Sequence, residues 1–249
     1  VKKMELEDGA NIIGVHMEGP FFADEYKGAQ NPDFLQYGTL ESLNKLIGNH
    51  WDILKILTFA PERVDEEVIQ ALKEKNVIAA IGHTGADNAL IEKANLLGAS
   101  HAVHLYNGMK GLHHREPGTA GAILSNDKIY AELILDGVHV RPKMAEIAYN
   151  CKGNKLILIT DAMKAASLQD GKYDLGGQDV FVQNGEARLA NGSLAGSTLT
   201  MDIAFKNALK YLSSNITDIV KLTSTNTANE LNLNTKGKIE VGRDADLVI

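Results

Sequence analysis

Four short segments each place a potential metal ligand or proton carrier at the end of an apolar run. They are His16-Met17-Glu18-Gly19-Pro20, Ile81-Gly82-His83-Thr84, Val103-His104-Leu105-Tyr106-Asn107 and Ile159-Thr160-Asp161-Ala162. The preceding apolar runs, such as residues 77–81 and 156–159, predict buried parallel strands. Because α/β barrels carry their chemistry at the carboxyl ends of parallel strands, the four segments together predict a metal-assisted active site.

Glu18, His83 and His104 supply one oxygen and two nitrogen donors. This set suits Zn²⁺, and also Fe²⁺ or Mn²⁺, with a position left open for water. Any one of the three, taken alone, is more simply a polar residue in a strand-to-helix loop. The three together favour a metal site.

Asp161 is the candidate proton carrier. A metal lowers the pKa of its bound water from 15.7 towards ~7, and a neighbouring carboxylate can take that proton and deliver it to a leaving nitrogen. The structural alternative is that Asp161 is the N-cap of a following helix.

Further polar residues suit substrate contacts. His139 could hydrogen-bond to a substrate oxygen, or be a structural histidine. Asn107, the backbone at Gly108 and the forked guanidinium of Arg115 suit an anion such as a phosphate, although Glu116 could instead neutralise Arg115. Residues 195–199 are small and either line a pocket or begin the next helix.

The elements that must position these residues alternate along the chain. Strands are predicted at residues 11–17, 56–59, 77–81, 102–105, 130–135 and 156–160, and helices at 39–47, 65–72, 87–97, 142–149 and 200–212. Such alternation indicates βαβ units and a parallel sheet, with six strands before residue 165. The fold class is therefore α/β.

A second pattern interrupts the alternation after residue 170. Val180-Phe181-Val182 and Ala187-Arg188-Leu189 flank Asn184-Gly185, which is a hairpin signal. Residues 238–241 and 247–249 also predict strands. These pieces indicate part of a small β module that two separated segments supply.

The composition excludes some classes of protein. The formal net charge of −7 argues against nucleic acid as the main partner. No apolar run approaches the ~20 residues that span a membrane. The single cysteine, Cys151, is compatible with a reducing cytoplasm, and we expect it to be a buried or semi-buried thiol without a role.

The motifs resemble, in type and order, those of the N-acetylglucosamine-6-phosphate deacetylase family of the amidohydrolase superfamily. The resemblance covers nearly the whole chain. The matching motifs are His16-Met17-Glu18-Gly19-Pro20-Phe21, Gly82-His83-Thr84, His104-Leu105-Tyr106-Asn107, His114-Arg115-Glu116-Pro117-Gly118, Asp136-Gly137-Val138-His139, Thr160-Asp161-Ala162 and Leu194-Ala195-Gly196-Ser197.

The resemblance implies a (β/α)8 barrel and hydrolysis of N-acetylglucosamine 6-phosphate to glucosamine 6-phosphate and acetate. It implies that Glu18, His83 and His104 hold the metal, that Asp161 activates water, and that His139 contacts the sugar or its acetyl group. Asn107, Gly108 and Arg115 would hold the phosphate. In this family the arginine comes from the neighbouring subunit, which implies a homodimer.

The chain departs from the family pattern in three places. Gly108 stands where alanine is usual, and Gln30 where some members have a histidine. No His-x-His pair precedes Glu18, so a second metal site has no visible ligands. We expect the family's first barrel strands to be absent from this sequence.

The expected domains follow from the resemblance to this family. Residues 1–170 and 196–235 would form the incomplete barrel, and residues 171–195 and 236–249 part of the small β domain. Two alternatives stay open: another amidohydrolase that acts on a cyclic or acyclic amide, and an inactive fragment of the deacetylase.

Overall fold

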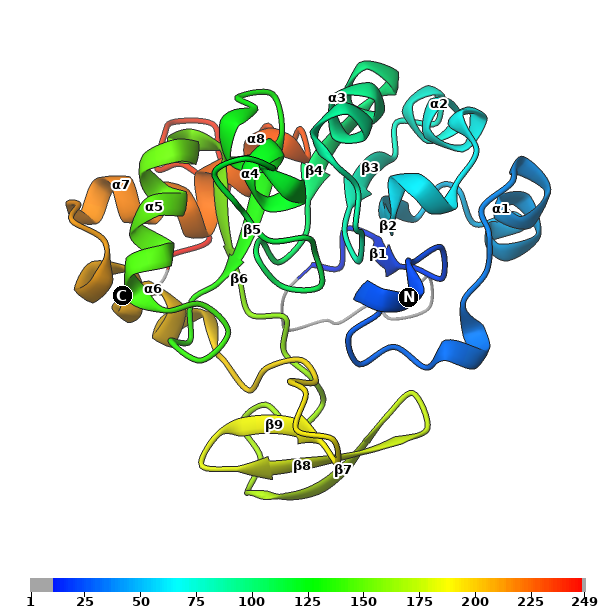
Figure 1. The fold of residues 1–249 in the computed structure, drawn as a ribbon. Helices are drawn as coiled ribbons and strands as arrows, with labels where there is room; N and C mark the ends of the chain where they lie inside the picture. Colours follow the sequence, from blue (N-terminus) through cyan, green and yellow to red (C-terminus); the bar gives the residue numbers. More distant parts are fainter. Residues whose placement is uncertain (1–10, 248–249) are drawn as a thin grey trace. The chain divides into compact units, whose positions relative to one another are not determined.

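The computed structural model describes residues 11–247, within which a parallel sheet is followed along the chain by a small antiparallel one (Figure 1). The larger sheet has six strands in the order β1-β2-β3-β4-β5-β6. Their bounds are Val15–Glu18, Leu54–Phe59, Ile78–Ile81, Ala99–Ala102, Tyr130–Ile134 and Leu156–Ile159. The pairs β1–β2, β2–β3 and β5–β6 are parallel. Most residues of β2, β3, β5 and β6 are buried, whereas those of β1 are intermediate or exposed. The predicted alternation of strands and helices is therefore confirmed.

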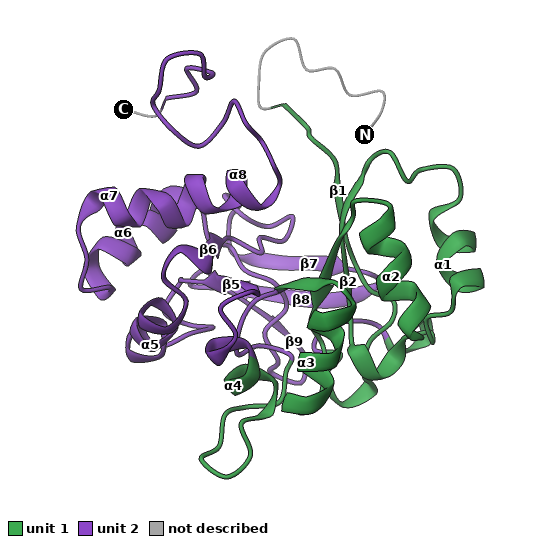
Figure 2. Ribbon diagram, turned by 90° about the horizontal axis from the view of Figure 1, so that it is seen from above, with its two compact units in different colours: residues 1–27, 32–101, 109–122 green, residues 28–31, 102–108, 123–249 purple. Residues whose placement is uncertain are grey.

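The chain divides into two compact units, coloured separately in Figure 2. Unit 1 comprises residues 1–27, 32–101 and 109–122, and unit 2 comprises residues 28–31, 102–108 and 123–249. The domain boundaries expected from the sequence are a different division and stay a prediction.

Three helices of unit 1 follow the expected pattern. They are α1 (Leu40–Ile47), α2 (Glu66–Glu74) and α3 (Asn88–Leu97). In α2, Val68, Ile69 and Leu72 are buried as expected, whereas α1 buries Leu43 and Ile47 and leaves its other two leucines, at 40 and 46, exposed. Each fully buried aliphatic side chain stabilises the folded chain by roughly 1.5–3 kcal/mol, so these buried residues hold α1 and α2 in place.

The helix ends show how local polar groups set the bounds. Thr39 caps α1 by accepting from the Ser42 amide at 3.1 Å, and Asp87 caps α3 by accepting from the Leu90 amide at 2.9 Å. Asp65 lies at the N-cap of α2 but makes no side-chain cap there. Its carboxylate accepts a hydrogen bond from the Tyr37 hydroxyl at 3.1 Å instead.

The helices of unit 2 include two that the sequence pattern predicted. These are α5 (Pro142–Lys152), with proline in its first turn, and α6 (Met201–Tyr211). Short elements were not predicted: α4 (Gly118–Ser125), which straddles the boundary between the units, and α7 (Ile216–Val220), a π-helical turn (Lys221–Thr225) and α8 (Asn226–Glu230).

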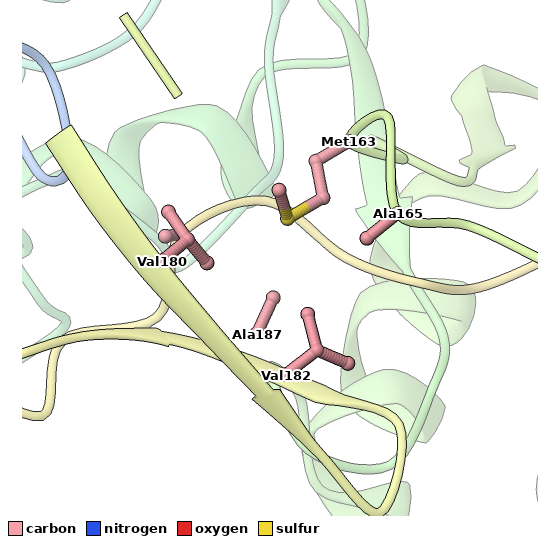
Figure 3. Close-up of a cluster of buried hydrophobic side chains, with 6 residues drawn as sticks. Met163, Ala165, Val180, Val182 and Ala187 are labelled. Carbon is pink, nitrogen blue, oxygen red and sulfur yellow. The ribbon is translucent and has the colours of Figure 1, made fainter. Parts of the chain in front are cut away.

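The small sheet consists of β7 (Gly171–Leu175), β8 (Gln178–Gln183) and β9 (Glu186–Leu189), paired antiparallel. Asn184 and Gly185 form the predicted two-residue hairpin turn, with φ values of 52° and 77°. Figure 3 shows the buried side chains of one face with Met163 and Ala165 packed against them. The sheet thus has a core of its own.

Three expectations were wrong. The fourth strand of the larger sheet ends at Ala102, so His104 lies in the following turn with a φ of 30° that no strand adopts. Cys151 is exposed. Residues 238–241 form no strand: within the described chain no neighbour pairs with them, Ile239 is exposed, and Arg243 hydrogen-bonds to Glu240 at 2.6 Å. The predicted strand at 247–249 lies almost wholly outside the described residues.

The described residues contain no helix whose length and apolar character would allow it to cross a membrane.

Candidate active site

Two predicted metal ligands of unit 1 meet at the carboxyl ends of their strands. Glu18 is the last residue of β1, and His83 lies two residues beyond the end of β3. Nε2 of His83 is 3.0 Å from Oε1 of Glu18. The spacing allows both atoms to face one ion, because a cation between them would replace the hydrogen bond that joins them.

Both histidines are oriented by backbone carbonyls through their other ring nitrogen. Nδ1 of His83 lies 2.8 Å from the carbonyl oxygen of Tyr26, and Nδ1 of His104 lies 3.1 Å from that of Asn107. A carbonyl only accepts, so in each case Nδ1 carries the proton. With Nδ1 bound to a carbonyl, Nε2 is the nitrogen of each ring that can ligate a metal, and in His83 the ion would displace the proton that Nε2 shares with Glu18.

Glu18, His83 and His104 form a group in which one ligand atom of each lies within 4.8 Å of the others. Both histidines are buried, and the Glu18 side chain is 32% exposed. One carboxylate and two imidazoles that are each held through Nδ1 fit a divalent ion such as Zn²⁺.

Three of the predicted site residues have left-handed backbone conformations. The φ values are 50° for His83, 30° for His104 and 47° for Asp161. Such conformations cost a non-glycine residue of order 1–3 kcal/mol and are concentrated at functional sites. Each of the three lies two residues after its strand, so the turn directs the side chain away from the strand's own alternation.

A segment far along the chain holds the backbone of Asp161. The Ser197 amide donates to the Asp161 carbonyl at 2.8 Å, and the Met163 amide donates to the Ser197 carbonyl at 2.9 Å. Ser197 thus pairs with the turn after β6, and α6 begins only at Met201, beyond the small residues at 195–199. Within the described chain no helix begins at Asp161, so the N-cap alternative finds no support.

His139 is held by a carboxylate that the sequence reasoning missed. Nδ1 of His139 lies 2.6 Å from Oδ2 of Asp136, whose other oxygen accepts from the backbone amides of Val138 and His139, each at 2.8 Å. Burial opposes ionisation of Asp136, but the hydrogen bonds and charge of His139 outweigh it and lower the pKa of this carboxyl group. The three-residue spacing of Asp136 and His139 was the available signal.

The expected phosphate contacts are found in two surroundings. Arg115 lies in an exposed loop, where its guanidinium contacts the His114 ring at 2.7 Å. Glu116 pairs with Lys110 rather than with Arg115, so the neutralising pair that the sequence left open does not form.

The half-buried Asn107 and Gly108 lie in a different setting. Nδ2 of Asn107 is 3.3 Å from the carbonyl oxygens of both His104 and Leu105. Gly108 has a φ of 56°, a conformation that glycine adopts at little cost.

Comparison with known proteins places these features in a family. A profile of the amidohydrolase family matches residues 57–249. The chain is 44% identical over 244 residues to an N-acetylglucosamine-6-phosphate deacetylase from Bacillus subtilis (strain 168), covering 97% of this chain and 62% of that protein. It is 37% identical over 242 residues to an N-acetylgalactosamine-6-phosphate deacetylase from Escherichia coli O157:H7, covering 96% and 64%.

A solved structure agrees with the fold. The N-acetylglucosamine-6-phosphate deacetylase of Thermotoga maritima superimposes with a TM-score of 0.88 at 38% identity, over 94% of this chain and 63% of that one. The fold class is thereby confirmed as that of a (β/α)8 barrel, six of whose strands occur here, with part of a small β domain. The chain spans less than two thirds of the length of each of these relatives. Because the profile matches most of its length, the chain belongs to the amidohydrolase family.

Proposed function

We propose that this chain carries the metal-dependent active site of a deacetylase that hydrolyses N-acetylglucosamine 6-phosphate to glucosamine 6-phosphate and acetate, in amino-sugar catabolism. The observation that carries the proposal is the grouping of Glu18, His83 and His104, with both imidazoles oriented through Nδ1. The substrate follows from the relatives, two of which are named for this activity.

Zinc is the ion we propose, with Fe²⁺ and Mn²⁺ as alternatives, because two imidazoles and one carboxylate suit all three. Glu18, His83 and His104 would hold it. When bound, such an ion supplies a lowered pKa for water and polarises a carbonyl oxygen.

Asp161 is the proposed proton carrier. Its carboxylate accepts a proton from water as the water oxygen attacks the acetyl carbonyl carbon. The C–N bond then breaks, and Asp161 returns the proton to the departing nitrogen. Acetate and the free amine are the products, so the carboxylate ends the cycle as it began.

The remaining residues position the substrate. His139, oriented by Asp136, would present Nε2 to the sugar or its acetyl group. The Asn107 side chain, the Gly108 amide and the Arg115 guanidinium would bind the phosphate.

Two further parts of the proposal concern assembly and location. Arg115 lies in an exposed loop, which suits the proposal that it reaches the site of a neighbouring subunit in a homodimer. The cytoplasm is the proposed location because a charged sugar phosphate does not cross membranes unaided.

A second candidate substrate is N-acetylgalactosamine 6-phosphate, which the name of the Escherichia coli O157:H7 relative favours. The two sugars differ only in the orientation of one hydroxyl group. The ratio of their kcat/KM values, measured on the same metal-loaded protein, decides between them.

The direct test is acetate release from N-acetylglucosamine 6-phosphate by protein freed of metal with a chelator and reloaded with Zn²⁺, Fe²⁺ or Mn²⁺. We expect turnover only after reloading, and much weaker turnover of unphosphorylated N-acetylglucosamine. Bound metal without turnover of either sugar phosphate would favour the inactive-fragment alternative. Efficient turnover of an unphosphorylated amide would favour another amidohydrolase.

A further inference from the structure

The turn that carries His83 is bound to a carboxylate on another element of unit 1. Glu62 lies in a short 3-10 turn, Pro61–Arg63, which follows β2. Its Oε2 accepts a hydrogen bond from the Thr84 hydroxyl at 2.5 Å, and its Oε1 accepts one from the Gly85 amide at 2.7 Å. Both oxygens of one side chain thus bind the two residues that follow His83.

The same turn is secured from its other side. The Thr84 hydroxyl, fully buried, also accepts from the Ala86 amide at 2.9 Å, and the Thr119 hydroxyl donates to the Ala86 carbonyl at 2.6 Å. The Lys110 amide donates to the Thr84 carbonyl at 3.1 Å. Glu62 therefore accepts hydrogen bonds from two consecutive residues of a turn that further side-chain and backbone hydrogen bonds also hold.

This network matters because His83 is in a conformation that it would not adopt on its own. Its φ is 50°, and its carbonyl accepts from the Ala23 amide at 3.0 Å. The Phe22 ring stacks on its imidazole with 4.2 Å between centroids. A left-handed residue persists only where its surroundings hold it there, and Glu62 holds the chain immediately after it.

Gly85 shows how little freedom the turn has. A Cβ atom at this position would lie 2.7 Å from the ring of Tyr26, the residue whose carbonyl binds Nδ1 of His83. The loop that orients the imidazole and the turn that Glu62 holds are thus in direct contact. A shift of the turn would move the imidazole relative to Glu18.

We propose that Glu62 is a positioning residue for the metal centre: by binding Thr84 and Gly85 it holds the backbone that directs Nε2 of His83 towards Glu18. The inference rests on the proposed function, since it needs a metal at Glu18 and His83. A carboxylate is required because it accepts two hydrogen bonds at once. A glutamine would present an N–H₂ group to one of the two donors.

The test compares zinc affinity, measured by competition with a chromophoric chelator, among the wild-type chain, Glu62→Gln and Glu62→Ala. Glu67→Gln, an exposed glutamate on α2, is the matched control. We expect zinc affinity to fall roughly 10–100-fold in Glu62→Ala and by less in Glu62→Gln, as for other outer partners of metal ligands. The control should bind zinc as the wild type does.

Two further readouts separate positioning from general stability. The visible spectrum of the Co²⁺-loaded protein reports ligand geometry, and it should change in Glu62→Ala while the far-ultraviolet circular dichroism stays that of the wild type. Thr84→Ser keeps the hydroxyl and should restore the affinity that Thr84→Val loses, which tests the contact even if Glu62→Ala fails to fold.

The outcomes distinguish the inference from the function on which it rests. Equal zinc affinity and equal Co²⁺ spectra in the wild type and the Glu62 variants would overturn the role of Glu62 alone. A wild-type chain that binds no metal would overturn the metal centre itself, and the role of Glu62 with it.

Discussion

Nδ1 of His139 lies 2.6 Å from Oδ2 of Asp136, and both side chains are largely shielded from solvent. The carboxylate also accepts the backbone amides of Val138 and His139, so its own position is fixed. The pair therefore holds the imidazole with its Nδ1 proton on the Asp136 side and leaves Nε2 for a partner outside the pair.

Asp136→Asn is expected to lower kcat/KM for N-acetylglucosamine 6-phosphate by about 10–100-fold, since a hydrogen bond to a charged group is worth about 1.5–3 kcal/mol. The amide can no longer bind both the ring and the turn in the same way, so the imidazole loses its fixed tautomer. Asp202→Asn, which changes a surface carboxylate paired with Lys206, is the control and should leave kcat/KM unchanged. Equal losses in both variants would contradict a specific role for Asp136.

Gly196→Ala tests how the segment after the small sheet holds Asp161. Gly196 has a φ of 64°, and an added Cβ atom would lie 3.3 Å from the Asp161 carbonyl oxygen. Left-handed strain alone is expected to destabilise the fold by about 1–2 kcal/mol. The displaced peptide of Asp161 should also reduce kcat.

Gly192→Ala is the matched control for this change. Gly192 has a φ of 87° and nothing within 4 Å of an added Cβ atom. An alanine at this position therefore adds left-handed backbone strain without a steric contact. Urea unfolding should show comparable destabilisation for the two variants, and acetate release should fall only for Gly196→Ala. A kcat that falls in both variants alike would contradict the account of Asp161.

Lys152 is expected to make stability depend on alkaline pH. Its ammonium is buried and donates to the Ile123 carbonyl at 2.9 Å and to the Asn126 carbonyl, and burial lowers its pKa to about 8. The unfolded chain, with an ordinary lysine pKa of about 10.4, binds more protons between these values, so the free energy of unfolding should rise as pH increases from about 8 to roughly 10.4.

The free energy of unfolding should rise by at most about 3 kcal/mol. The measurement is the difference in this free energy between wild type and Lys152→Met across the pH range. Other titrating groups cancel in that difference. A difference that stays constant from pH 7 to 10.5 would show that the pKa of Lys152 is not lowered.

Arg115→Gln is expected to raise KM for the sugar phosphate about 10–100-fold with a smaller change in kcat, because the guanidinium would bind a group remote from the scissile bond. Glu116→Gln changes the neighbouring residue, which pairs with Lys110, and serves as the control. An unchanged KM in Arg115→Gln would remove this arginine from the phosphate site.

The parallel sheet could be predicted because buried strands leave continuous apolar runs in the sequence. Residues 77–81 and 156–159 are such runs, and they gave β3 and β6. The strand before His104 was placed three residues too late, because Ala99-Ser100-His101-Ala102 has no apolar continuity. The residue types therefore marked His104 as a candidate ligand, whereas the local pattern misplaced the strand that precedes it.

The grouping of Glu18, His83 and His104 could be predicted from the sequence, whereas the contacts that hold these residues could not. Glu18, His83 and His104 stand out because metal-binding residue types follow strands. The left-handed turns at His83 and Asp161, and the contact between Glu62 and Thr84, depend on residues that are far apart in sequence or on φ angles that residue type does not dictate. Only the folded chain brings them together.

The central claim is that Asp161 carries the proton in a metal-dependent deacetylation, and one measurement tests it most directly. Wild type and Asp161→Asn are loaded with zinc, their metal content is determined, and acetate release from N-acetylglucosamine 6-phosphate is followed. We expect equal metal content and a loss of turnover of at least about 100-fold in the variant, since general acid–base catalysis contributes about 10²–10⁴-fold. Unchanged turnover in Asp161→Asn at equal metal content would contradict the mechanism.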